Sequence, residues 1–288
     1  MRTHRSILAS TVLLVAAACG ATQEAAPPPP VAAAPAPFAY ALNLGVADLA
    51  ERSQDLVLAV ENLLAKLENH DLAAAKVAYI EARAPYEEIE VLRASFPELH
   101  LAIDGRPSDF PGGEVDPDFG GFHAIELALW AREDHKSALP FALALYDDVQ
   151  SLRGLLRGPL DLDAATTFAT MATRTGEVAS RTITSEEETW SEATLTVIRH
   201  NWIGVHSVYR HFAGAVRDRD GVVAEQLDRA YRRALEVIAR DFPVGEVAGT
   251  PFALVDREKR RKIADASLAF RARLLDAART IGVGQVDA

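Results

Sequence analysis

Cysteine is almost absent from this sequence, and basic residues are scarce. The 288 residues contain one Cys, and 30 Lys plus Arg stand against 41 Asp plus Glu, for a formal net charge of -11. A single cysteine excludes a disulfide-rich scaffold, and the acidic balance argues against nucleic acid, whose phosphates an acidic protein repels. Alternating strand patterns and hairpin turns are nearly missing. Hydrophobic residues make up 49%, which excludes the collagen-like and disordered classes and suffices for one large core or two smaller ones.

The first 37 residues read as targeting and tether rather than as fold. A short basic start precedes the apolar run Ile7–Ala18, which is too short to span a bilayer but suits a signal-peptide core. The stretch Val15–Gly20 resembles a bacterial lipobox, although the position of the usual bulky residue is occupied by Ala. We therefore predict a signal peptide over 1–18, lipidation of Cys19 and a Pro/Ala-rich linker over 19–37. An ordinary secretory signal stays open as the alternative. Either reading predicts export, and lipidation predicts a membrane-anchored protein of the periplasm or cell envelope.

From Phe38 onward the apolar residues recur at helical spacing. Eight stretches show this three-and-four alternation, at about 49–67, 72–96, 119–134, 138–157, 163–181, 195–216, 221–241 and 255–280. Asp71, Asp163 and Ser185 (with Glu188 three residues later) are typical of helix starts. The pattern predicts an all-α protein of two antiparallel four-helix bundles, over 38–160 and 161–288.

One predicted connection is unusually long. Residues 97–118 contain four Pro and two adjacent Gly, and long loops in compact domains are often functional. Just after this loop, His123 and Glu126 stand three residues apart on a predicted helix, where both side chains can reach one ion. Two further acids, Glu90 and Asp104, border the predicted bundle interior, where facing helices build metal sites.

Neighbouring charged residues have plainer explanations. Glu87 lies four residues after Arg83 and is explained by a helical ion pair, so we expect Glu87 and Glu88 to be solvated. Arg106 either binds a ligand carboxylate or forms a loop salt bridge. An acidic run, Glu186–Glu188, falls in a predicted first helical turn and is a candidate for a second metal site.

Several of these segments together resemble one known family. They are Ala82–Glu90, Ser95-Phe96, Ile103–Arg106, Gly121–Trp130 and Ile183–Glu188. They resemble the imelysin-like family, within it the EfeO/EfeM branch of bacterial iron-uptake lipoproteins, and the resemblance extends over roughly residues 40–280. It implies two helical bundles and a metal site formed by Glu90, Asp104, His123 and Glu126. It also implies iron as cargo, with an iron permease and a haem peroxidase as partners. The Gly/Pro-rich loop Pro107–Gly120 departs from the family pattern.

Three carboxylates and one imidazole form a hard, oxygen-rich donor set. Such a set suits iron, manganese or calcium better than structural zinc, so the residues predict a hard cation and the resemblance specifies iron. We expect a binding protein rather than an enzyme. The alternatives are an imelysin-type metallopeptidase and an envelope scaffold lipoprotein. Against hydrolysis, the sequence has neither His-Glu-x-x-His nor Gly-x-Ser-x-Gly. His200, His206 and His211 are off helical register with one another and predict no site.

Overall fold

A computed structural model describes residues 38–180, 183 and 188–283. The chain divides into the units Met1–Pro35 and Ala36–Ala288, and every described residue belongs to the second. The predicted signal peptide, the lipidation site Cys19 and the linker therefore lie outside the described residues, and these assignments stay predictions.

Helices form the regular structure of the described part of the chain, which contains no β-strand. The prediction of an all-α protein is therefore confirmed. The α-helices are α1 (Ala39–Glu68), α2 (Leu72–Ile89), α3 (Pro97–Asp104), α4 (Gly121–Glu126), α5 (His135–Leu156), α6 (Ala164–Ser180), α7 (Thr194–Tyr209), α8 (Ala213–Arg219), α9 (Gly221–Ile238) and α10 (Arg257–Ile281). None of them is both long enough and apolar enough to cross a membrane.

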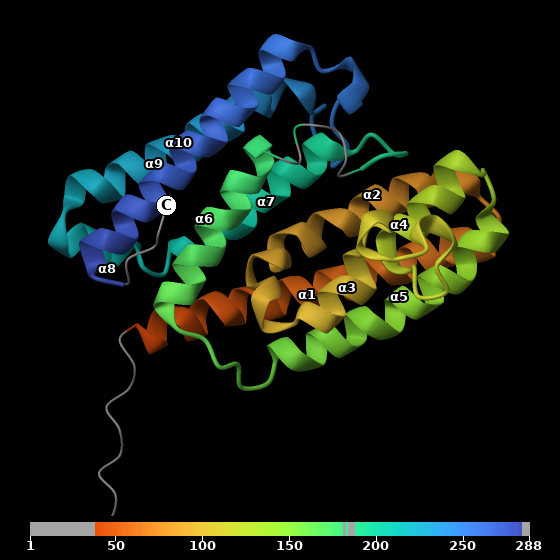
Figure 1. Ribbon diagram of the computed structural model, residues 1–288, viewed down its shortest axis with the longest axis horizontal. Coiled ribbons are helices and arrows are strands. Elements are labelled where there is room, and N and C mark those ends of the chain that lie inside the picture. Colours follow the sequence, from red (N-terminus) through yellow and green to blue (C-terminus); the bar gives the residue numbers. More distant parts are fainter. Residues whose placement is uncertain (1–37, 181–182, 184–187, 284–288) are drawn as a thin grey trace, which may run out of the picture. The chain divides into compact units, whose positions relative to one another are not determined.

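In the first part of the chain, α2, α3 and α4 pack against the two long helices α1 and α5. The long helix α1 lies along α2 and α5, and α5 also contacts the short helices α3 and α4 (Figure 1). The apolar stripe predicted for α1 is its buried face: Leu49, Leu56, Val60, Leu63 and Leu67. Burial of this stripe against α2 and α5 stabilises the helix far more than its intrinsic propensity does.

The later helices pack on α10, and α7 joins the two groups. Helix α10 lies against α6, α8 and α9, while α7 contacts α1, α2, α6 and α9. The contact with α2 is so close that a Cβ atom on Gly204 would lie 2.3 Å from the carbonyl oxygen of Glu88. The larger of two hydrophobic core clusters in the described part of the chain extends from Ala41 to Val283, and the smaller one comprises Phe119, Ala124 and Leu127. The predicted division near residue 160 falls between α5 and α6, and two separate bundles stay a prediction.

Two of the predicted helix starts are confirmed, and the third differs. Asp71 caps α2 by accepting from the N–H of Ala74, and Asp163 accepts from the N–H of Thr166 before α6. Ser185 lies outside the described residues. The next helix, α7, begins only at Thr194, so Glu188 stands in a bend before it rather than in a helical turn.

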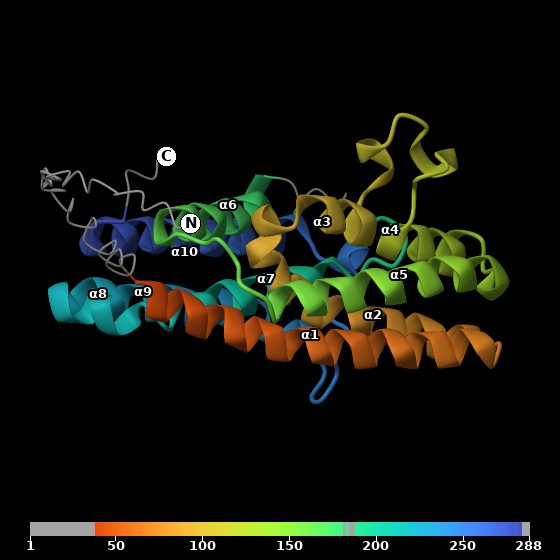
Figure 2. The same cartoon turned by 90° about the horizontal axis from the view of Figure 1, so that it is seen from below.

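The prediction that residues 97–118 form a loop is wrong over the first third of this segment. Residues Pro97–Asp104 form α3, because proline suits the first position of a helix and Glu98 favours the positive end of its dipole. The rest of the loop contains 3-10 turns at Pro107–Asp109 and Gly113–Val115. This segment between α3 and α4 stands out from the helices (Figure 2).

Candidate metal centre

A fully buried arginine lies at the middle of the candidate site. Arg83 on α2 donates to Glu87 at 2.5 Å and also donates to Asp104 at the end of α3. Its Nε lies 2.8 Å from Oε1 of Glu188, an ion pair whose angle falls short of a hydrogen bond. One guanidinium group on α2 thus contacts carboxylates of α2, α3 and the segment before α7.

The predicted ion pair between Arg83 and Glu87 is confirmed, but the solvated state of Glu87 and Glu88 is wrong. Their exposed fractions are 1% and 6%. Glu87 is covered because Arg83 turns inward toward Asp104 rather than outward to water. Glu88 faces Arg52 at 2.8 Å and His200 at 2.8 Å. Helix α2 is buried on all sides over this stretch, so its acids cannot reach bulk water.

A glycine brings His123 close to Asp104. Gly121 begins α4 with a φ of 64°, and a Cβ there would lie 2.3 Å from the carbonyl oxygen of Ile103. The start of α4 therefore rests directly on the last turn of α3. As a result, Nε2 of His123 lies 3.5 Å from Oδ1 of Asp104, and both side chains are buried.

Glu126 fixes the imidazole of His123 from the other side. Its Oε2 lies 3.2 Å from Nδ1 of His123. Its Oε1 accepts from the backbone N–H groups of Trp190 at 3.0 Å and Ser191 at 2.7 Å. A π-helical turn, Leu127–Ala131, follows α4 directly, and such turns are frequent at functional sites. If Nδ1 carries the proton that Glu126 accepts, Nε2 is left as a lone-pair donor.

Two buried atoms of a kind that can bind a metal have no hydrogen bond at this point. Neither Nε2 of His123 nor Oδ2 of Asp104 has a hydrogen-bond partner among the described residues. Buried polar atoms in native proteins are nearly always hydrogen-bonded, so an unpaired pair of this kind calls for a ligand or another specific explanation.

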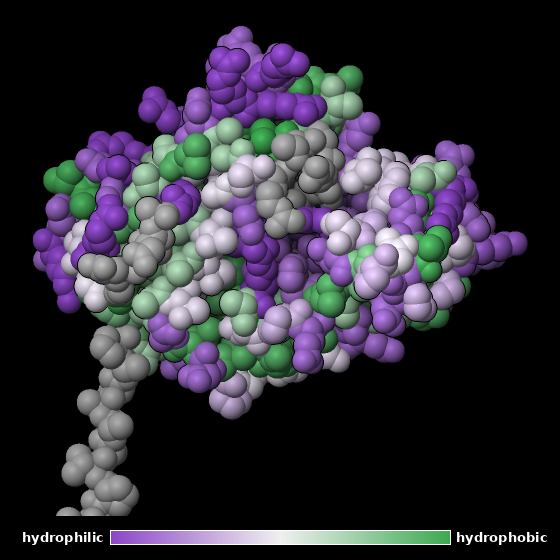
Figure 3. All heavy atoms as spheres, viewed as in Figure 1, coloured by the Kyte–Doolittle hydropathy of each residue, from purple (hydrophilic) through white to green (hydrophobic). Residues whose placement is uncertain are grey.

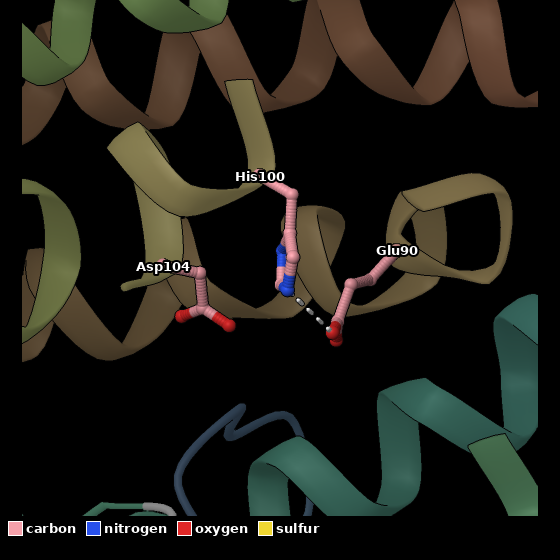
Figure 4. A group of neighbouring side chains, drawn as sticks. All are labelled: Glu90, His100 and Asp104. Atoms are coloured by element: carbon pink, nitrogen blue, oxygen red, sulfur yellow. Dashed lines mark ion pairs between the residues drawn. The ribbon is translucent and has the colours of Figure 1, made fainter. Parts of the chain in front are cut away.

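The acidic and histidine side chains fall into two groups rather than one. In the first, Glu90, His100 and Asp104 each offer a ligand atom, all within 4.8 Å of one another (Figure 4). In the second, His123, Glu126 and Glu188 do so within the same limit. All six side chains are buried except His100, which is partly exposed.

The four residues predicted from sequence thus form a row. Glu90 neighbours Asp104 in the first group, Asp104 contacts His123, and His123 contacts Glu126. No single group of described residues contains all four. Asp104 is the member that touches both groups.

Comparison with known families identifies the family of this chain. The family model described as imelysin, peptidase M75, matches residues 42–275. The chain belongs to the imelysin family.

Relatives of this imelysin chain carry iron-related names. It is 26% identical over 190 residues to the iron uptake system component EfeM of Pseudomonas syringae pv. syringae, covering 66% of each chain. It is 29% identical over 170 residues to the iron uptake system component EfeO of Yersinia pseudotuberculosis, covering 59% of this chain and 45% of that protein. It is 24% identical over 228 residues to an EfeM/EfeO family lipoprotein of Staphylococcus aureus, covering 75% and 76%. The chain thus spans less than two thirds of the EfeM and EfeO proteins.

The fold of this imelysin chain also matches a solved structure. A Parabacteroides distasonis protein described as an iron-regulated protein A precursor superposes with a TM-score of 0.66 at 14% sequence identity. The match covers 85% of this chain and 96% of that one. At this identity the likeness establishes the shared helical fold.

Sequence reasoning missed two members of these candidate groups, His100 and Glu188. His100 lies four residues before Asp104, a spacing that places both on one face of a helix, but the segment was expected to be a loop. Glu188 was considered only with Glu186 and Glu187, which lie outside the described residues. It instead lies in the second group with His123 and Glu126, where Tyr79 donates to it at 3.2 Å and Ser191 at 2.7 Å.

Negative charge exceeds positive charge inside this region. Two buried arginines, Arg83 and Arg174, stand against the buried carboxylates of Glu87, Glu88, Glu90, Asp104, Glu126 and Glu188. Arg174 donates to Glu90, and Arg93 donates to the same carboxylate at 3.0 Å. A region of this kind favours a bound cation or retains protons on some of its acids.

Burial and this surplus of negative charge shift the pKa values of Asp104, His123 and Glu188. Burial opposes ionisation of Asp104, but Arg83 holds the pKa of that carboxyl well below its usual range. Burial likewise opposes the charge on His123, yet the bond to Glu126 raises the pKa of the imidazole. Burial, followed by the nearby charge of Glu126, raises the pKa of Glu188 to about 7.

The raised pKa of Glu188 predicts how stability depends on pH. The folded state holds this proton more tightly than the unfolded chain, whose pKa is near 4.5. Stability of the metal-free protein should therefore fall as the pH rises from about 5 to about 8. Glu188→Gln should reduce this slope, leaving contributions of the same sign from Glu87 and His123, whose pKa values are also raised. Denaturant midpoints across this range measure the effect.

The exposed Glu81→Gln on the same helix as Arg83 serves as the control and should keep the parent slope. A parent protein whose stability is flat from about pH 5 to 8 would contradict the assignment of a retained proton to Glu188.

Proposed function

We propose that this chain is a lipid-anchored, extracytoplasmic iron-binding protein that presents iron to an uptake permease. Its ligands are drawn from Glu90, Asp104, His123 and Glu126, with the ion as cargo rather than as a resident cofactor. The observation that carries the proposal is the pair of buried, unpartnered ligand atoms, Nε2 of His123 and Oδ2 of Asp104. They lie on side chains in direct contact and among a surplus of carboxylates.

The chemistry of these donors supports a hard cation. Carboxylate oxygens and one imidazole nitrogen suit ferrous or ferric iron, and also manganese. Relatives named as iron uptake components support iron among these. Both oxygens of Glu126 already accept hydrogen bonds, but an ionised carboxylate has about four lone-pair sites and can bind an ion in addition.

The location rests on a relative, and the partners rest on the family resemblance of the sequence. A matched Staphylococcus aureus protein is named a lipoprotein, which supports the anchoring of Cys19 and a place in the cell envelope. An iron permease and a haem peroxidase of the same uptake system are the proposed partners. We propose a carrier without enzymatic activity. The rival function is that of a metallopeptidase, which the name of the family suggests. Hydrolysis of casein by the purified protein, abolished by a chelator, would favour that rival.

Iron titration of the mature protein tests the proposal. We expect tight binding of iron, and an anomalous scattering peak at the iron edge beside Asp104 and His123 in iron-soaked crystals. Absence of binding, or a peak elsewhere, would reject the site.

Asp104→Asn is expected to lower iron affinity about tenfold, ~1.4 kcal/mol, because it removes a charged ligand while keeping the side-chain shape. Calorimetry or chelator competition measures the change. The matched control is Asp218→Asn, an exposed acid on α8 outside the candidate centre. Equal affinities for the two variants would contradict a role for Asp104.

A further inference from the structure

The two groups of ligands have different access to solvent. We propose that they are successive stations for one ion, and this inference rests on the proposed function. Glu90, His100 and Asp104 form an entry station, and Asp104 with His123, Glu126 and Glu188 forms the holding station behind it. His100 is the residue that this assignment adds.

A surface pocket opens onto two members of the entry station, His100 and Asp104. The pocket has a volume of about 500 Å³, and its lining also includes Arg106. Among the described residues, His123, Glu126 and Glu188 do not contribute to its lining. Figure 3 shows a hollow with hydrophilic atoms on this face, in the region of α3 and α6. An ion arriving from solvent therefore meets His100 and Asp104 before it can meet His123.

Both histidines are held in the same way. Nδ1 of His100 lies 2.8 Å from the hydroxyl of Tyr86, as Nδ1 of His123 lies 3.2 Å from Glu126. In the tautomer in which Nδ1 donates to this partner, Nε2 is the atom available to an ion. Nε2 of His100 lies 3.9 Å from Oε1 of Glu90, and the three side chains of the entry group turn toward one space (Figure 4).

The charges around the two stations make the entry station the weaker binding site for a cation. Arg174 and Arg93 both donate to Glu90, so much of its charge is already compensated. The side chain of His100 is also 27% exposed, which allows water to compete. In the holding group, Glu126 and Glu188 are buried and Arg83 is the cation paired with Glu188. An ion is therefore stabilised more by moving inward.

Asp104 makes the transfer possible without releasing the ion. Its carboxylate lines the pocket and also lies 3.5 Å from Nε2 of His123. Asp104 stays bound while the ion exchanges His100 and Glu90 for His123 and Glu126. The step is ligand exchange with no change of oxidation state, so it requires no oxidant or reductant.

The proposal predicts that His100 controls rates rather than affinity. His100→Ala in the full mature protein should slow both association and release of ferrous iron at least tenfold, leaving the dissociation constant within about threefold. Association is followed by quenching of tryptophan fluorescence, since the backbone of Trp190 donates to Glu126. Release is followed by transfer to a coloured ferrous chelator.

Two further variants complete the test. His100→Gln preserves the polar side chain if His100→Ala is poorly folded, and it should slow both rates similarly. His211→Ala removes a histidine paired with Asp48 at 2.6 Å outside the proposed stations and should leave both rates unchanged.

Each outcome is decisive. Unchanged rates in folded His100 variants would overturn the entry station while leaving the iron site intact. A loss of affinity in His100→Ala as large as that in His123→Ala would overturn it too, by making His100 a ligand of the final site. Absence of iron binding by the parent protein would instead overturn the proposed function itself.

Discussion

His123→Ala is expected to lower iron affinity about a hundredfold, ~2.7 kcal/mol, while the protein stays folded. The imidazole presents a buried nitrogen that has no hydrogen bond, next to an equally unpartnered oxygen of Asp104. Its removal deletes the nitrogen ligand of the holding station. Glu126 retains the backbone N–H groups of Trp190 and Ser191 as donors, so the loss should not unfold the centre. Competition with a coloured chelator under anaerobic conditions measures the affinity, and circular dichroism verifies the fold.

His211→Ala is the matched control for this experiment. His211 also pairs with a carboxylate, at 2.6 Å, but its partner Asp48 belongs to α1, away from the candidate centre. We expect this variant to bind iron as the parent protein does. If His123→Ala and His211→Ala bound iron equally well, the assignment of His123 as a ligand would be wrong.

The helices could be predicted because their signals are local. The stripe on α1 recurs at intervals of three, four or seven residues, and the caps at Asp71 and Asp163 each lie within a single turn, so periodicity and residue type reveal them. Helix α3 was missed because the proline that begins it directly follows the predicted helical stretch 72–96 and was taken as the end of that helix and the start of the loop. Both readings agree with the conformational limits of proline, and only packing decides between them.

The candidate site was harder to predict from the sequence, because the residues in contact there are far apart along the chain. Arg83 pairs with Glu87 four residues away, and sequence spacing predicted that pair correctly. Its partners Asp104 and Glu188 lie 21 and 105 residues further on, and no local pattern links them to Arg83. The inward turn of Arg83 explains why Glu87 is buried rather than solvated.

Gly121→Ala is expected to destabilise the protein by about 3 kcal/mol, because a left-handed backbone costs a non-glycine residue 1–2 kcal/mol and overpacking adds a similar amount. The new Cβ would meet the carbonyl oxygens of Ile103 at 2.3 Å and Ala102 at 2.5 Å, which are backbone atoms that cannot rotate away. Relief requires α4 to move off α3, which separates His123 from Asp104. The melting temperature should fall by roughly 6 to 12 °C, and iron affinity should fall with it.

The preceding residue provides the control for this prediction. A Cβ on Gly120 meets no atom within 4 Å, and its φ of -147° is open to alanine. The free energy of unfolding of Gly120→Ala should therefore lie within about 0.5 kcal/mol of that of the parent protein. The variant should also bind iron equally well. Thermal melts and iron titrations of both variants distinguish a local steric requirement from a general sensitivity of this turn. Were Gly121→Ala to match its neighbour in both measurements, the contact between α3 and α4 could not be what brings His123 to Asp104.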